Sequence, residues 1–452
     1  GNITAYAGGV SPQAGGVGTI YIKKSFQANG DLILKNNFNL GNTLISGTFD
    51  NVYIRDSANI KISSGSSLYS TNLYVQNGGI LTNYGTLSVS EIALVQANGY
   101  IRQNGGDFTV GTFTVDSYGT LYLDSKIIAG SVIIKENGLL THDTKITGSE
   151  LQISGDLVVE TGGKIDLSGK GHGIAEGPGA GTSVGGGNAQ NGSEAGSGAG
   201  HGGLGGNSDI AVGGALYGIL KEPAELGSGG GNSGPVSGGS GAGTIKISVA
   251  GNANIDGDII LNGTNGQYST VYYNGWWRAM AGGGGSGGSI YLNIQGGLNG
   301  TGRITAKGGN VSGKAGGGAG GRIALYCSVF SFWGDLSVKA GGIGNTAGQN
   351  GTIYLKIGTD ELNGNAYAST GADPIEKDED GTVIYRNTQN VNATGNTTIQ
   401  NLTTPINLTG KFYLNGNLSN NMSENLSSAT NSFYVFDNPV MLTFSADKKA
   451  YK

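Results

Sequence analysis

The sequence predicts an all-β protein: a right-handed parallel β-helix with glycine-rich loops and an irregular C-terminal cap. Three observations support this fold class. Glycine accounts for 89 of the 452 residues. A unit of about 20 residues recurs through residues 51–171, and a longer glycine-rich unit recurs between residues 1 and 357. Repetition at a fixed period indicates stacked structural units rather than one globular core.

The composition excludes several other classes of protein. The glycine share is roughly three times the average of about 7 %, but the glycines keep no period of three, which excludes collagen. Charged residues make up 13 % of the chain and hydrophobic residues 37 %, too many apolar residues for a disordered protein. Ile, Leu, Val and Tyr alternate with polar residues in short runs, and no window has a helical period. We therefore expect strands and very little helix.

The 20-residue units predict the rungs of the β-helix. Each unit holds two or three alternating runs separated by Asn-Gly, Gly-Gly or Asp-Ser, which supply the positive φ angles of tight turns. Three strands of four to five residues with tight turns use about 20 residues, and the next rung then pairs in parallel. The general crossover rule predicts a right-handed path. The repeat lacks the signatures of leucine-rich repeats and propeller blades. The anchors of successive units, spaced 19 or 21 residues apart, are Val52, Leu73, Ile92, Phe113, Val132 and Leu151.

The glycine-rich unit also appears at both ends of this region. Residues 1–24 and 334–357 align without a gap, and both contain Ala-Gly-Gly followed by Gly-Thr-Ile-Tyr. We interpret each copy as a rung in which a glycine-rich loop replaces one side. The loop at about 168–243 is the longest, and it fits either disorder or close-packed extended segments. The copies of the unit lie at 1–24, 163–249, 257–294, 302–326 and 334–357.

The predicted domain organisation follows from where the glycine-rich unit ends. Residues 1–360 form the parallel β-helix. Residues 361–452 are rich in Asn and Thr around short strands, and they predict a β continuation or a cap. A cap is expected because an open end of the helix would expose unpaired strand edges.

Charge and hydropathy narrow the expected partners and location. The net charge is −5 without a basic cluster, which argues against nucleic acid. No apolar run reaches the roughly 20 residues of a membrane span. The one cysteine, Cys327, lies in an apolar run and is expected to be a buried thiol. No signal peptide is present, so we expect a mature or trimmed fragment, monomeric, of a larger secreted protein.

Several of these segments resemble a known group of proteins. GGGGSGGSIYLNI, GGGAGGRIALYC and GQNGTIYLKI are similar to the glycine-rich β-helix segments of large bacterial and archaeal surface adhesins. The resemblance covers residues 1–24 and about 163–357. The architecture and one aromatic loop also resemble the tāpirins, cellulose-attachment proteins of extremely thermophilic bacteria. This resemblance implies an extracellular protein on the cell surface with a β-helical binding domain that exposes aromatic residues. We expect no cofactor apart from the Ca²⁺ ion considered below.

The best candidate binding site is the aromatic segment 267–285, QYSTVYYNGWWRAMAGGGG, in the variable loop of one glycine-rich unit. Aromatic faces stack on the apolar faces of sugar rings, and a row of them forms a platform for a polysaccharide. The alternative is that the loop folds back and buries its aromatic rings as a lateral cover. The candidate ligand-binding residues are Tyr268, Tyr272, Tyr273, Trp276, Trp277 and Arg278.

Catalysis and metal binding have weaker support. Pectinolytic lyases built on a β-helix need several acidic residues for Ca²⁺ and an Arg or Lys base on one face, and hydrolases need paired carboxylates. The outward ionisable residues of 51–171 are single and of mixed sign, and we expect no ladder of carboxylates among them. His172 and His201 fit either a metal pair or two solvated side chains. An acidic turn near Gly381 resembles a crude Ca²⁺ loop without the usual spacing. Its weak candidate ligands are Asp373, Asp378 and Asp380.

The sequence thus favours a non-catalytic extracellular adhesin that binds an insoluble polysaccharide, such as cellulose, through exposed aromatic residues. Two alternatives remain open at this point. One is a structural stalk or filament segment, and the other is a polysaccharide lyase or hydrolase built on a β-helix.

Overall fold

The structure is a computed structural model that describes residues 17–35, 42–185, 193–273, 275–342 and 346–358, and beyond these only the backbone of further strands. Every regular element in these residues is a β-strand, and no helix occurs among them. Most of the strands join long parallel sheets. The expected all-β class is therefore confirmed. The part of the chain that the structure describes also contains no helix long and apolar enough to cross a membrane.

The chain divides into two compact units. Unit 1 comprises Gly1–Asp166, Ile245–Ile259 and Ile294–Arg303. Unit 2 comprises Leu167–Thr244, Ile260–Asn293 and Ile304–Lys452.

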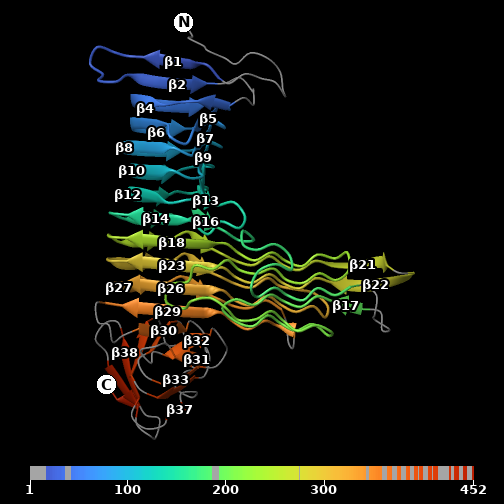
Figure 1. The fold of residues 1–452 in the computed structure, drawn as a ribbon. Helices are drawn as coiled ribbons and strands as arrows, with labels where there is room; N and C mark the ends of the chain where they lie inside the picture. The colour runs from blue at the N-terminus through green and yellow to red at the C-terminus, as the bar shows by residue number, and fades with distance from the viewer. Residues whose placement is uncertain are drawn as a thin grey trace. The chain divides into compact units, whose positions relative to one another are not determined.

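Two parallel sheets form unit 1, and Figure 1 shows their strands stacked one above the next. The strands of the first sheet are β2 (Asp31–Lys35), β4 (Gly47–Arg55), β6 (Ser67–Val75), β8 (Thr86–Val95), β10 (Asp107–Val115), β12 (Ile127–Ile134), β14 (Glu150–Ile153), β15 (Leu157–Val159), β18 (Thr244–Val249), β19 (Ala253–Ile255) and β24 (Gly297–Gly300). The strands of the second are β3 (Asn42–Leu44), β5 (Asn59–Ile62), β7 (Ile80–Asn83), β9 (Tyr100–Gln103), β11 (Thr120–Leu123), β13 (Leu139–Thr141) and β16 (Lys164–Asp166).

The pairing of the strands follows the period of the sequence. In the first sheet Val52 lies opposite Leu73, and Phe113 lies opposite Val132, as the anchors predict. The anchor Ile92 is off by one, because Leu73 and Phe113 both pair with Ala93. The reason is a β-bulge between Ser70 and Asn72 of β6, where two residues of β8 lie opposite one residue of β6. The bulge shifts the register by one residue, and Ile92 therefore lies on the solvent face. The anchor Leu151 is also wrong, because it pairs with Ile127 while Val132 pairs with Leu157.

The core of unit 1 consists of apolar side chains stacked in columns. One column runs through the second sheet, where each residue pairs in register with the next and all are fully buried. Its outward neighbours are polar or only partly buried, as expected for alternating strands. The column consists of Ile60, Leu81, Ile101, Leu121, Leu140 and Ile165.

The first copy of the glycine-rich unit does not pair as the sequence predicts. β1 (Thr19–Ile22) runs antiparallel to β2, whereas the matching strand of the last copy, β29 (Thr352–Ile357), runs parallel to β26 (Arg322–Cys327). Only eight residues, 23–30, separate β1 from β2. A parallel connection needs a dozen residues or more, so this short link forces the chain to reverse.

Unit 2 contains its own parallel strands and a large glycine-rich region. β23 (Ser289–Ile294), β26 and β29 pair in parallel, with Ile290, Ile323 and Ile353 in one buried row. Cys327, at the end of β26, is buried as expected. Two short strands, β27 (Val329–Phe332) and β28 (Asp335–Ser337), follow β26. β20 (Asp258–Ile260) and β25 (Arg303–Thr305) begin in unit 1 and end in unit 2.

The glycine-rich region of unit 2 packs with a three-residue period. Gly282, Gly285 and Gly288 donate their N–H groups to one neighbouring segment, at Gln267, Thr264 and Leu261. The residues between them donate to two other segments. Gly283 and Ser286 donate to the carbonyl groups of residues 231 and 228, respectively. Gly284 and Gly287 donate to those of residues 316 and 319. Successive residues thus donate in three different directions, and the pattern repeats every three residues. This is the geometry of a polyproline II helix, which has three residues per turn and no internal hydrogen bonds.

We call this region the glycine bundle. Figure 1 shows its segments running side by side toward β21 (Tyr268–Tyr273) and β22 (Trp276–Ala281). The segments with the clearest three-residue period span residues 196–202, 227–231, 282–288 and 316–321, and their neighbours span 239–243, 261–267 and 306–309.

Glycine is required in the bundle because there is no room for a Cβ atom. A Cβ placed on Gly283 would lie 1.8 Å from the carbonyl oxygen of Ser197, and one on Gly198 would lie 1.8 Å from that of Gly317. Neither glycine has a positive φ. Of the two alternatives for residues 168–243, the described part therefore packs as close extended segments.

Beyond residue 358 the structure gives strands without side chains, and the expected cap lies in this region. β30, β34, β36 and β38 pair in parallel in succession, and so do β33, β35 and β37. The strands are β30 (Gly364–Ala368), β31 (Pro374–Lys377), β32 (Val383–Arg386), β33 (Val391–Thr394), β34 (Thr397–Gln400), β35 (Ile406–Thr409), β36 (Lys411–Asn415), β37 (Ser427–Ser428), β38 (Ser432–Phe436), β39 (Met441–Phe444) and β40 (Ala450–Tyr451).

Candidate functional site

The aromatic segment of unit 2 is a β-hairpin, not an irregular loop. β21 (Tyr268–Tyr273) and β22 (Trp276–Ala281) pair antiparallel, with Tyr272 opposite Trp277. The strands are joined by Asn274 and Gly275, and Gly275 has a φ of 84°. Asn-Gly between alternating residues is the strongest short-range signal for a hairpin with a two-residue turn, and this signal was present in the sequence.

Three aromatic rings lie exposed on this hairpin. The exposed fraction is 53 % for Tyr268, 64 % for Tyr272 and 71 % for Trp277. Residues 268, 270 and 272 of β21 alternate onto one face, and Trp277 shares that face because it is the cross-strand partner of Tyr272. The Tyr272 and Trp277 rings meet edge to face, with centroids 5.6 Å apart and planes at 62°. They form an exposed aromatic surface that we call the aromatic face.

The aromatic face carries no charge among its described side chains. Besides the three rings it presents Thr270, which is exposed, and Ala279, which is partly buried. Ring faces beside a hydroxyl suit a ligand with apolar C–H surfaces and hydroxyl groups.

Arg278 occupies a different position from the aromatic residues. It lies on the opposite face of β22, is only 8 % exposed, and its Nη1 is 3.3 Å from Oε1 of the buried Glu194. Glu194 belongs to β17 (Ser193–Ala195), which pairs in parallel with β22. Arg278 therefore binds the hairpin to its neighbouring strand, and the surface available to a ligand does not include its guanidinium group.

The hairpin is also held at its base by small apolar residues. Ala195 and Ala281 pack with Ala315 in a buried cluster, and Val311 contacts it. The exposed rings therefore sit on a fixed support, which lowers the entropy lost when a ligand binds.

The remaining predicted site residues lie outside the described part of the chain. The side chains of Tyr273 and Trp276 are among them, and so are those of Asp373, Asp378 and Asp380. Among the residues that the structure does describe, no group of three or more His, Cys, Asp or Glu side chains could hold a metal ion.

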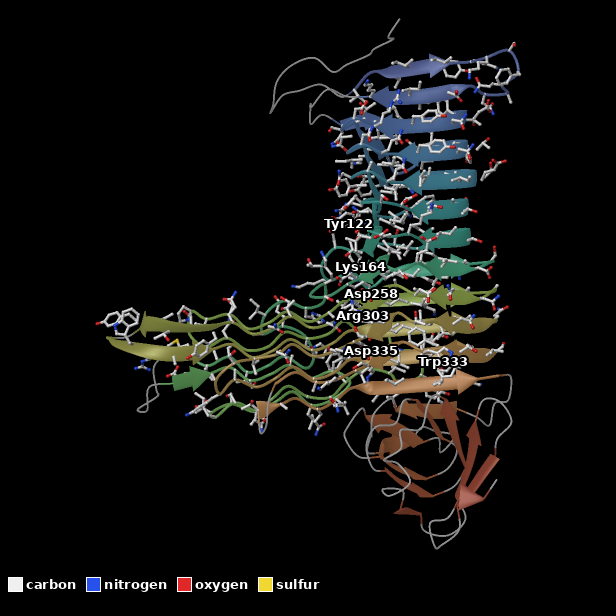
Figure 2. The ribbon with its side chains drawn as sticks, turned by 180° about the vertical axis from the view of Figure 1, so that it is seen from behind. Tyr122, Lys164, Asp258, Arg303, Trp333 and Asp335 are labelled. Atoms are coloured by element: carbon white, nitrogen blue, oxygen red, sulfur yellow. The ribbon has the colours of Figure 1, made fainter. Side chains whose placement is uncertain are left out.

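One cluster in unit 1 brings two carboxylates together. Arg102 Nη1 lies 3.2 Å from Asp124 Oδ2 and also contacts Asp143, while its guanidinium stacks over the Tyr122 ring at 4.2 Å. Tyr122 is labelled in Figure 2. Asp124 is buried, and its other oxygen accepts the Asp143 backbone N–H at 2.7 Å. The single guanidinium contacts both carboxylates, so the cluster is an ion-pair network.

A second ion pair lies further along unit 1. Arg303 donates to Asp258 through Nε at 2.7 Å and Nη2 at 2.6 Å, a bidentate pair. Figure 2 shows the two residues next to each other, close to Lys164. The Asp258 side chain is mostly buried and that of Arg303 is mostly exposed.

His201 fits neither of the alternatives considered for it. It is fully buried and stacks on the Tyr217 ring, with centroids 4.6 Å apart. Its Nδ1 lies 2.7 Å from the carbonyl oxygen of Gly287, which can only accept, so Nδ1 carries the proton. Burial, assisted by the Arg322 charge, lowers the pKa of His201 to about 3. The imidazole is therefore a neutral structural group at ordinary pH.

The described geometry thus singles out the aromatic face as the candidate site. No protein-family model matches this chain, and no curated protein is significantly similar to it in sequence.

Proposed function

We propose that this protein is a non-catalytic extracellular adhesin of the cell surface, and that its aromatic face binds an insoluble polysaccharide such as cellulose. The observation that carries the proposal is the exposure of Tyr268, Tyr272 and Trp277 on one uncharged face of a supported hairpin. Large exposed aromatic groups cost free energy in water, and such patches mark interaction sites.

The chemistry of this face favours a neutral polysaccharide. The rings offer their faces to the C–H surfaces of sugar rings, and the Thr270 hydroxyl and backbone groups offer hydrogen bonds. The only described cation of the hairpin, Arg278, is already paired with Glu194, so no described charge of the hairpin attracts an acidic polymer. Binding at one hairpin is weak, and many copies on a repetitive solid surface raise the overall affinity.

We also propose that the stacked strands follow the path of a right-handed parallel β-helix. In-register parallel pairing at intervals of about 20 residues in unit 1 supports this path. The handedness follows the general rule for parallel crossovers. Such a stack can also serve as a stalk that separates a binding surface from the cell, and the regular rungs of unit 1 are the observation that favours this second role.

A pull-down with microcrystalline cellulose tests the adhesin proposal. Wild type should move to the pellet, and Tyr272→Ala/Trp277→Ala should bind at least tenfold more weakly, because it removes the two touching rings. Tyr118→Ala is the matched control, since Tyr118 is an exposed aromatic residue in a turn of unit 1. If wild type stays in the supernatant with cellulose, chitin and xylan alike, or the double variant binds as well as wild type, the proposal fails.

The non-catalytic part of the proposal has its own test. Wild type incubated with cellulose, pectin or alginate should release no reducing ends and no unsaturated products. Release of either product, abolished by Asp124→Asn in the Arg102 cluster, would instead establish a lyase or hydrolase.

A further inference from the structure

The aromatic face of the hairpin ends at a turn from a neighbouring segment, residues 310–314. At the base of the hairpin, Ala281 lies opposite Tyr268 of β21 and opposite Ala195 of β17, so the three side chains share the aromatic face. A Cβ placed on Gly313 would lie 3.9 Å from the Cβ of Ala281 and 3.4 Å from Cε2 of the Tyr268 ring. The turn therefore lies against the base of the aromatic face, beside the exposed Tyr268 ring.

The turn is held in place from two sides. The backbone N–H of Asn310 donates to Oδ1 of Asn265 at 2.8 Å, and its carbonyl oxygen accepts the N–H of Gly266 at 3.0 Å. These contacts fix the turn to the segment that leads directly into β21. On the other side, Nζ of Lys314 lies 3.5 Å from Oδ2 of Asp209. The surface beside the first ring of the hairpin is thus preorganised, which lowers the entropy lost when a ligand binds there.

Tyr268 is separated along the strand from the two touching rings nearer the hairpin turn. From Tyr268 to Tyr272 the chain advances four residues, or about 13 Å at roughly 3.3 Å per residue. Thr270 lies between them on the same face and offers its hydroxyl group. A single sugar ring is too short to contact both positions, whereas an extended chain of sugar units reaches from one to the other.

We propose that Tyr268 and the turn 310–314 form a second sugar-binding position, so that the site takes an extended glycan chain along β21 and not a single sugar. This second position rests on the proposed function of the aromatic face. One part of the chain stacks on Tyr272 and Trp277, and another part stacks on Tyr268. The exposed Ser312 of the turn offers a hydroxyl group to the sugar at the second position. Binding at both positions is tighter than at either alone, because the second contact is intramolecular.

Titration with cellobiose and cellohexaose tests the second position. Saturation-transfer NMR suits this measurement, because it detects weak binding. Wild type should bind cellohexaose about tenfold more tightly than cellobiose. Tyr268→Ala should lose most of this gain and bind cellobiose like wild type, because Tyr272 and Trp277 remain. Tyr118→Ala, which removes an exposed ring of unit 1, is the matched control and should keep the gain. The matching disaccharide and hexasaccharide are used if the pull-down favours chitin or xylan.

A second substitution tests the turn itself. Gly313 has a φ of 65°, which Asn also adopts, so Gly313→Asn keeps the turn and places a side chain beside the Tyr268 ring. This variant should bind cellohexaose more weakly than wild type and cellobiose equally well. Gly65→Asn is the matched control, because Gly65 has a φ of 78° and a Cβ there meets nothing within 4 Å. Circular dichroism checks that each variant keeps its strands.

Two results would overturn the second position and leave the adhesin proposal standing. In the first, wild type binds the solid polysaccharide but binds its hexasaccharide no more tightly than its disaccharide. In the second, wild type prefers the hexasaccharide, but Tyr268→Ala and Gly313→Asn keep the full preference. A wild type that binds neither the solid polysaccharides nor the oligosaccharides would overturn both proposals.

Discussion

Unit 1 and the glycine bundle of unit 2 stack extended chain by opposite means. In unit 1 the core consists of side chains: Leu121 packs on the residues above and below it in a buried column. In the bundle the backbone itself is the core, and segments approach until a Cβ on Gly283 would overlap a carbonyl oxygen. Hydrophobic burial stabilises the first arrangement, and backbone hydrogen bonds between segments of the same chain stabilise the second.

This difference determines which amino-acid substitutions each region tolerates. A side-chain core accepts another apolar residue of similar volume, at a cost usually below about 1.5 kcal/mol. A backbone core accepts no side chain at positions such as Gly283 and Gly198, where a Cβ would overlap a neighbouring carbonyl oxygen. The following predictions test the contrast, from the largest effect to the smallest.

The largest effect should come from a side chain inside the bundle. Gly283→Val should destabilise unit 2 by about 4 kcal/mol or more, because its Cβ would lie 1.8 Å from Ser197 O. Gly185→Val is the matched control: a Cβ there meets nothing within 4 Å, and the change should cost less than about 0.5 kcal/mol. Hydrogen exchange measured by mass spectrometry should show lost protection in 196–202 and 227–231 and unchanged protection in unit 1. Equal effects of the two variants would contradict a backbone core.

A cavity in the side-chain core should have the next largest effect. Leu121→Ala removes a fully buried side chain from unit 1 and should cost about 2–5 kcal/mol. Leu121→Met keeps most of the volume and should cost less than about 1.5 kcal/mol. In the Leu121→Ala variant, amide hydrogen exchange should become faster in the neighbouring strands β9 and β13 and stay unchanged in the glycine bundle. Faster exchange confined to residues 282–288 would show that the two cores are not independent.

The buried imidazole of the bundle predicts a dependence on pH. Burial lowers the pKa of His201 to about 3 from 6.5. Below pH 6.5 the unfolded chain takes up a proton that the folded chain refuses until about pH 3. Stability should therefore fall as the pH falls through this window, by up to about 1.4 kcal/mol per unit. His201→Phe keeps a ring beside Tyr217 but cannot titrate, so urea unfolding between pH 6.5 and 4 should show a shallower slope. An unchanged slope would show that this group does not titrate on unfolding.

The smallest effect should come from the surface ion pair of unit 1. Asp258→Asn weakens the bidentate contact with Arg303 and should cost about 1 kcal/mol or less, since the guanidinium is mostly exposed. The difference from wild type should shrink further in 1 M salt. A cost as large as that of Leu121→Ala would mean that charge, not apolar stacking, stabilises this region.

The sequence predicted the side-chain core better than the backbone core. Alternation and period indicated the rungs, and Val52–Leu73 and Phe113–Val132 pair as expected. Local backbone detail was harder, because a bulge such as the one that displaced Ile92 leaves no mark in the apolar pattern.

The three-residue bonding of the bundle could not be read from the residues. Glycine occupies nearly every position of 282–288, so no side-chain pattern reports the direction of each N–H group. The aromatic residues were found from their position in the variable loop of one glycine-rich unit. Their exposure, and the burial of Arg278 beside them, depends on β17, which lies more than 80 residues earlier in the chain.

The connectivity of the glycine bundle has a consequence for how the chain folds during synthesis. The strands of unit 1 from β2 to β16 pair with one another at separations of about 20 to 25 residues, so each can form soon after it is made. Gly202 instead donates to Gly320, and Gly317 to Thr346. The bundle has a high contact order and must wait for more than a hundred residues of later sequence. Until then residues 196–202 have only those native partners that lie nearby in the sequence, such as Gly179 and Gly206, and the scarcity of apolar side chains in this segment limits its aggregation.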